Sequence, residues 1–102
     1  MKITFLGTSA GESYPAVWCD CENCTYARAH GGRNLRMNTG TMIDSDTLLD
    51  MNSCGFYTAA RLGVSLTGVR SLLVTHPHPD HLTIEPLACC ARSAGRCAAG
   101  AF

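Results

Sequence analysis

This sequence lacks a net charge, a long hydrophobic run and any segment that resembles a secretory leader. Its 102 residues include 8 basic (Lys and Arg) and 8 acidic (Asp and Glu) side chains, so the formal net charge is zero. That balance argues against a nucleic-acid or membrane partner held by bulk electrostatic attraction, although it leaves room for a local anion site. The chain opens on a strand-like segment, and the apolar segment from Leu87 is interrupted by two arginines and is too short to cross a bilayer. We therefore expect a cytoplasmic protein.

Histidine and aspartate are also missing from every position beyond His81. Three of the four histidines and one aspartate gather instead in the segment Thr75-His76-Pro77-His78-Pro79-Asp80-His81, directly after the mostly apolar residues 71–74. Neutral imidazole nitrogens suit zinc, iron or nickel, and a carboxylate oxygen adds charge compensation. The segment predicts a metal site whose ligands are His76, His78, Asp80 and His81.

The spacing within this segment supports a shared site. On an extended backbone His76 and His78 project from the same face, roughly 6–7 Å apart along the chain. The two prolines between and after them cannot donate ladder hydrogen bonds, so we expect the strand to end near Thr75 and the ligand loop to be rigid. Asp80 and His81 follow, at an expected helix entry, and can turn back toward the same volume. The alternative is an exposed turn that happens to be rich in histidine.

The chain has seven cysteines, many for its length. Because the count is odd and no leader is seen, we expect thiols or metal ligands rather than disulfides. Cys19, Cys21 and Cys24 form a C-x-C-x-x-C cluster that predicts a structural zinc site, with unliganded thiols as the alternative. His30 is a candidate fourth ligand, but on a helix it lies about 240° round from Cys24. The lone Cys54 is expected to be a buried small hydrophobe.

Periodicity and turn residues predict one layered α/β half-domain. Gly7 to Gly11 form a loop whose small residues allow close backbone approach, and Leu62 and Val64 are expected to face inward. The predicted elements are a strand at 2–6, a helix at 22–30, two hairpin strands at 41–44 and 47–50, a helix at 56–62 and a buried strand at 69–75.

The last residues differ in composition from the rest. Ala, Gly, Cys and Arg supply all but three of residues 87–102, and no acidic or β-branched residue occurs there. We interpret residues 83–102 as an atypical tail read out of frame, since GC-rich codons in another frame yield this mixture. An Ala-rich terminal helix is the alternative, and Gly95 and Gly100 weaken it.

The Thr75–His81 segment matches the T-H-x-H-x-D-H signature of the metallo-β-lactamase fold superfamily. Residues 3–8 and 48–50 resemble the first strand and the early aspartate of that superfamily. The insert Cys19-Asp20-Cys21-Glu22-Asn23-Cys24 is similar to the cysteine motif of phosphoribosyl cyclic phosphate phosphodiesterases. The resemblance covers residues 1–82 and implies the N-terminal half of a metallo-β-lactamase αβ/βα sandwich, apparently truncated.

The resemblance also implies a chemistry. His76 and His78 would bind one Zn²⁺, Mn²⁺ or Fe²⁺ ion, and Asp80 and His81 a second. Asp80 would also orient the catalytic water in phosphodiester hydrolysis by a metal-bound hydroxide. Thiolester, lactam and RNA-end hydrolysis share the signature, and the cysteine insert alone favours a small phosphate ester. In that family a later histidine would complete the cysteine zinc site.

The sequence departs from the family pattern in two places. The later His, bridging Asp and final His of the family have no counterpart here, so we expect weak metal binding and little or no turnover from this chain alone. Asp50 is followed by Met51-Asn52-Ser53-Cys54-Gly55, where the family usually places a glycine sooner, which leaves the role of Asp50 open. The rival function is a non-catalytic fragment that binds zinc only.

Two further expectations concern surfaces. Arg33 and Arg36 could grip a substrate phosphate in a bidentate way, although a solvated loop is the commoner setting for surface arginines. A half-domain of this fold would expose the apolar sheet face that normally meets its partner half, so we expect self-association.

Overall fold

The computed structural model describes residues 1–88, which form a four-stranded sheet with a helix on one face and a long insert at one end. The predicted tail therefore lies mostly outside the described residues, and the division into 1–82 and 83–102 stays a prediction. The elements, in chain order, are β1 (Ile3–Gly7), α1 (Glu22–His30), η1 (Gly32–Asn34), β2 (Gly40–Ile43), β3 (Thr47–Leu49), α2 (Gly55–Arg61) and β4 (Ser71–Leu73).

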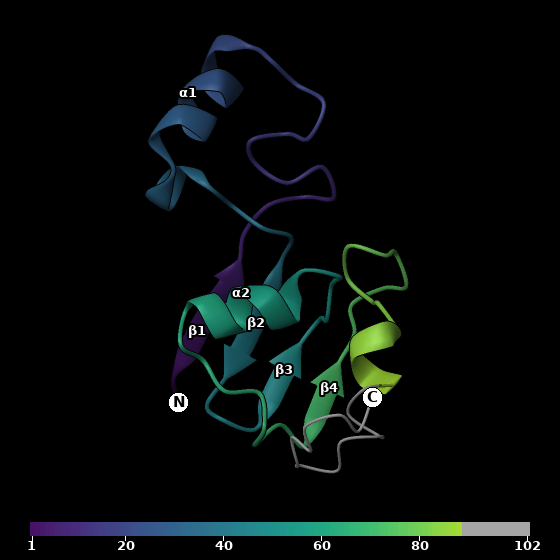
Figure 1. Ribbon diagram of the computed structural model, residues 1–102. Coiled ribbons are helices and arrows are strands. Elements are labelled where there is room, and N and C mark those ends of the chain that lie inside the picture. The colour runs from purple at the N-terminus through teal and green to yellow at the C-terminus, as the bar shows by residue number, and fades with distance from the viewer. Residues whose placement is uncertain (89–102) are drawn as a thin grey trace, which may run out of the picture.

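The sheet has the order β1-β2-β3-β4. β1, β2 and β3 are antiparallel neighbours, whereas β3 and β4 are parallel because α2 carries the chain back across the sheet. As a result β1, β3 and β4 all finish at the same end of the sheet, as their arrowheads show (Figure 1). Loops that follow these three strands are thereby brought to one edge.

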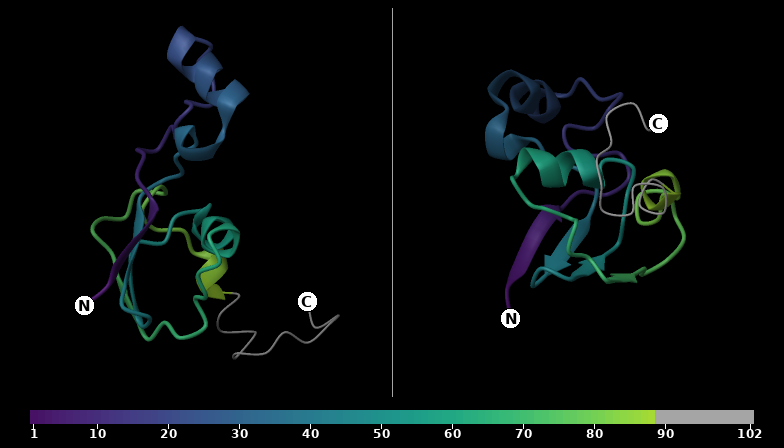
Figure 2. Two further views of the ribbon diagram at one scale, coloured as in Figure 1. Left: turned by 90° about the vertical axis from the view of Figure 1, so that its left-hand side faces the viewer. Right: turned by 60° about the horizontal axis from the view of Figure 1, so that its bottom comes forward.

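The core lies between the sheet and α2. Leu6, Leu48, Met51 and Ala59 are buried together, with Val64 and Leu72 among the partly buried side chains packed against them. The alternation of side chains along a strand explains why these strand residues enter the core. Leu48 pairs with Leu72, and both side chains point toward α2. The side view of Figure 2 shows α2 on one side of the sheet.

The opposite face of the sheet is apolar and exposed. Phe5, Thr41, Leu49 and Leu73 form one cross-strand row on that face. Phe5 is 66% exposed and Leu73 is 53% exposed, and Ile3 lies on the same face as Phe5. This agrees with the exposed sheet face that the sequence predicts. It corrects the prediction of a buried final strand, because β4 is the edge strand and nothing among residues 1–88 covers its outer face.

The insert between β1 and β2 stands beyond the end of the sheet and carries α1 (Figures 1 and 2). The predicted helix at 22–30 is confirmed. Arg28 ties α1 to the preceding loop by donating to the carbonyl oxygens of Ala16 and Cys19. Gly31, with a φ of 60°, ends the helix and donates its N–H to Ala27 O at 2.9 Å.

Gly7 and its neighbours show the close backbone approach that their small size predicts. A Cβ on Gly7 would lie 1.9 Å from Asn38 O, so no larger residue fits without a backbone shift.

Two smaller predictions are wrong: Leu62 is 54% exposed because it follows α2 on the solvent side, and Cys54 is half-buried at the start of α2. No helix within residues 1–88 has the length and apolar character needed to span a membrane.

Candidate metal centres

The histidine segment forms a compact turn after β4. His81 and Leu82 both donate their N–H groups to His78 O at 2.8 Å, which folds the segment back on itself. The predicted helix entry at Asp80 and His81 is wrong, because helical residues begin only at Glu85. The backbone next to Met51 anchors the turn instead: Met51 N–H donates to His81 O at 2.8 Å.

This turn brings together three of the four predicted ligands. One ligand atom each from His76, Asp80 and His81 lies within 4.8 Å of the others, and all three side chains are half-buried. His78 is outside this group, and its ring packs edge-on against the His76 ring with 4.6 Å between centroids. The His76 and His81 rings lie closer, at 3.9 Å. Two imidazoles and a carboxylate are the donor set of many zinc and iron sites, so these residues fit a divalent cation.

Asp50 orients His81 within this group. It follows β3 with a φ of 62°, is 4% exposed, and its Oδ2 lies 2.7 Å from His81 Nδ1. The backbone N–H of Thr75 donates to Asp50 Oδ1 at 2.7 Å, and the Thr75 hydroxyl also donates to the carboxylate. With Nδ1 engaged by Asp50, the Nε2 atom of His81 faces Asp80, at 3.3 Å from its Oδ2. A histidine whose second nitrogen contacts a carboxylate is a common arrangement at metal sites.

These contacts also set the charge of Asp50. Burial alone would raise the pKa of its carboxyl group, but the hydrogen bonds from His81 and Thr75 outweigh burial and hold the pKa below its usual value. The carboxylate therefore stays ionised beside His81, where it favours an imidazole that carries its proton on Nδ1. The missing early glycine does not prevent this role, because Asp50 itself adopts the left-handed backbone conformation that the turn needs.

Two buried asparagines, which the sequence analysis missed, place the first loop beside the same group. Asn52 Nδ2 donates to Thr39 O at 2.8 Å, and Asn38 Nδ2 donates to Ala10 O at 2.8 Å. This pins the loop so that a methyl group on Gly11 would lie 3.6 Å from the Asp80 carboxylate. A single asparagine has no spacing signal in sequence, so only the long-range contacts reveal it.

The cysteine cluster forms a second group, in the insert. The sulfur atoms of Cys19, Cys21 and Cys24 lie within 4.8 Å of one another, and none of the cysteines within residues 1–88 is disulfide-bonded. His30 does not join them: its Nδ1 lies 2.9 Å from Tyr26 O and its ring stacks on Tyr26. The prediction that His30 faces away from the cluster agrees with this position.

The start of α1 favours a thiolate in this cluster. Cys21 caps the helix by accepting the Cys24 N–H at 3.5 Å. That backbone hydrogen bond, with further ones from the Cys19 and Cys24 thiols, lowers the pKa of Cys21. A backbone N–H of Cys21 lowers the pKa of Cys19, but the hydrogen bonds with the Cys21 and Cys24 side chains outweigh it, so the net pKa of Cys19 is raised. Three neighbouring sulfurs, one of them with a lowered pKa, fit a cation that thiolates bind, such as zinc.

The chain has a metallo-β-lactamase fold over part of that fold's length. Its sheet with a parallel final strand and the histidine turn at the strand ends are the features of that fold class. Among solved structures it is similar to a diphosphatase from the PhnP family, with a TM-score of 0.67 and 23% identity over 91% of this chain and 37% of that one. It is also similar to Zn²⁺-bound PqqB from Methylobacterium extorquens, with a TM-score of 0.67 and 22% identity over 78% of this chain and 31% of that one.

The chain thus spans about a third of the length of each of these structures. No family model matches the sequence, and no curated protein matches it either. The two structures confirm the predicted metallo-β-lactamase fold over part of its length.

Proposed function

We propose that this chain carries part of the active site of a metal-dependent hydrolase that cleaves small phosphodiesters. The observation that carries the proposal is the convergence of His76, Asp80 and His81 within 4.8 Å on the turn after β4. The metallo-β-lactamase fold supports the reaction class, and the likeness to a PhnP-family diphosphatase supports phosphate-ester chemistry. The cysteines within residues 1–88 have free thiols, which supports a cytoplasmic location.

The side chains suggest a division of roles. His76, His81 and Asp80 would hold the cation, with His78 beside them as the fourth predicted ligand. A divalent cation at such a site polarises the phosphoryl oxygen and acidifies water. Asp50 would keep the proton of His81 on Nδ1, and Asp80 would accept a hydrogen bond from the attacking water. The cysteine cluster would hold a separate zinc ion that stabilises the insert.

A non-catalytic zinc-binding fragment is the second candidate. It is favoured by the three cysteine sulfurs, which form a compact thiol group with a lowered pKa at Cys21 and need no part of the histidine turn. The two candidates predict different metal contents. The hydrolase needs metal at the histidine turn, whereas the zinc-only fragment binds one ion per chain at the cysteines.

The test is to load the full chain with cobalt(II) and to assay bis-p-nitrophenyl phosphate hydrolysis in parallel. Because the chain carries only part of the site, the hydrolase proposal predicts weakly bound cobalt without thiolate absorption and at most a slow turnover. Asp80→Asn should abolish both the cobalt binding and any turnover, and Cys21→Ser should keep both. Glu85→Gln, which alters an exposed acidic side chain outside the group, is the matched control. Turnover that survives Asp80→Asn, or cobalt bound only through thiolates, would contradict the proposal and favour the zinc-only fragment.

The zinc site in the insert has its own reporter, because Trp18 is the sole tryptophan, is 95% exposed and precedes Cys19. We expect zinc to change the Trp18 fluorescence of the full chain and of His76→Ala, but not of Cys19→Ser. An equal response in Cys19→Ser would remove the cysteines from the proposal.

A further inference from the structure

A pocket distinct from both metal groups opens at the end of β1. It lies between the segment from η1 to β2 on one side and α2 on the other, with a cavity volume of about 670 Å³. Small-molecule sites in proteins commonly have volumes of about 300–1,000 Å³. None of the metal-group residues lines it. Its lining includes the apolar side chains of Leu6, Leu35, Met37 and Leu62, the hydroxyl-bearing Thr58, and the arginines described next.

The pocket concentrates positive charge in a chain of zero net charge. Arg33 and Arg36 come from the η1–β2 segment and Arg61 from α2, and no acidic residue is in the lining. Arg28, which lies outside the pocket, differs from these arginines because its guanidinium group already donates hydrogen bonds to two backbone carbonyl groups. Within residues 1–88 none of the three pocket arginines forms a salt bridge or a side-chain hydrogen bond.

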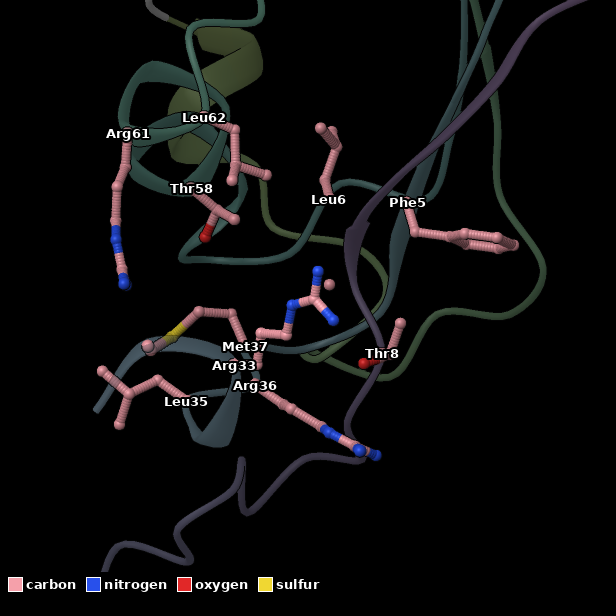
Figure 3. A pocket seen from close by; sticks show the side chains of 12 residues that line it. Phe5, Leu6, Thr8, Arg33, Leu35, Arg36, Met37, Thr58, Arg61 and Leu62 are labelled. Carbon is pink, nitrogen blue, oxygen red and sulfur yellow. The ribbon is translucent and has the colours of Figure 1, made fainter. Parts of the chain in front are cut away.

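The remaining walls are apolar. Figure 3 shows Leu6 and Leu62 across the space from Leu35 and Met37. The hydroxyl group of Thr58 is already engaged, because it donates to Cys54 O at 2.9 Å. A ligand of this pocket therefore needs negative charge for the guanidinium groups and an apolar part for the leucine and methionine side chains.

We propose that this pocket binds an organic phosphate: a small molecule with a phosphate group and an apolar or aromatic part. A carboxylate carries one charge and two oxygens and is satisfied by a single guanidinium group. A phosphate ester carries up to two charges and three free oxygens, so it can be shared between arginines that reach it from opposite sides of a pocket. The proposal does not rest on hydrolysis at the histidine turn.

The test is a calorimetric titration of the full chain with phenyl phosphate in the presence of excess chelator. We expect saturable binding that weakens by about tenfold in Arg33→Gln and in Arg61→Gln, the loss typical of one charged hydrogen bond. Arg70→Gln, an exposed arginine outside the lining, is the matched control and should bind as the parent chain does. Inorganic phosphate and benzyl alcohol, which each supply one half of the ligand, should bind at least tenfold more weakly than phenyl phosphate.

His76→Ala should bind phenyl phosphate as tightly as the parent chain, which separates this pocket from the proposed hydrolase. Leu62→Glu adds a second probe, because it puts a carboxylate on an exposed side chain of the lining, where it repels a phosphate, and should abolish binding. The proposal is overturned if phenyl phosphate does not saturate the chain, if Arg33→Gln and Arg61→Gln bind like Arg70→Gln, or if inorganic phosphate binds equally well.

Discussion

At the scale of single residues, Asp50 connects the sheet to the histidine turn. Its carboxylate lies 2.7 Å from His81 Nδ1 and accepts from both the backbone and the hydroxyl group of Thr75. The side chain is 4% exposed, so any partner that it loses cannot be replaced freely by water. Substitutions at Asp50 should therefore affect both the stability of the fold and the binding of metal.

Asp50→Asn should weaken metal binding at the histidine turn by about 10–100-fold, because His81 loses the carboxylate that orients it. It should also lower the free energy of unfolding by about 1–3 kcal/mol, since an amide is a poorer acceptor for three donors. Cobalt titration and urea unfolding measure the two effects. Asp46→Asn is the control, because within residues 1–88 that exposed carboxylate accepts only from the neighbouring Thr47 hydroxyl, at 3.1 Å. Equal losses in both variants would remove the special role of Asp50.

The lowered pKa of Asp50 also predicts a pH dependence. Its carboxylate is favoured in the folded state, so its stabilising contribution is complete above the unfolded pKa of about 3.9 and is lost as the pH falls through the lower folded pKa. Urea unfolding of the metal-free chain at a series of pH values should show this acid loss. Asp50→Asn should show a shallower decline below about pH 4. An identical decline in the variant would assign the effect to other groups.

At the scale of elements, the contact between β1 and the segment before β2 depends on Gly7. A Cβ there would meet the backbone of Asn38 at 1.9 Å and of Met37 at 2.7 Å. Gly7→Ala should lower the free energy of unfolding by about 1–3 kcal/mol, the cost of overpacking. Gly11→Ala is the control, because its Cβ would meet Asp80 at an ordinary 3.6 Å. Thermal unfolding compares the two, and equal stability would contradict the predicted clash.

The same elements show what local sequence can predict. The helix at Glu22–His30 was predictable because the glycines that follow it end a helix locally. The hairpin of β2 and β3 was predictable because a short turn between two strands acts over a few positions, although the turn has three residues, 44–46, and not two. The exposure of β4 was not predictable, because the apolar content of a strand does not tell whether a neighbouring layer covers it. Asn38 and Asn52 were missed for a related reason, since their partners lie far away in sequence.

At the scale of the whole molecule, the exposed sheet face is the dominant feature. Ile3, Phe5 and Leu73 are each more than half exposed on the side away from α2. Large apolar side chains exposed together on one face are typical of an interaction site. We propose that two copies of the chain associate through this face.

Sedimentation at several protein concentrations tests this proposal. The parent chain should associate as its concentration rises. The double variant Ile3→Lys/Leu73→Lys should stay monomeric, because both substitutions place a charge in the contact. Tyr57→Lys is the control, since this side chain is 62% exposed on α2 and away from the sheet face. A parent chain that is monomeric with a sharp, cooperative thermal transition would contradict the proposal.

The sequence by itself determined the residue types of both metal groups, the helix at 22–30, the hairpin and the metallo-β-lactamase resemblance, because these depend on spacing within short segments. Only the tertiary structure decided which ligands meet. It grouped His76 with Asp80 and His81, joined His81 to Asp50 across 31 positions, and set three arginines from two elements around one pocket. Such pairings follow from strand order and from the turn after β4, and backbone packing, not local spacing, determines where those ends lie.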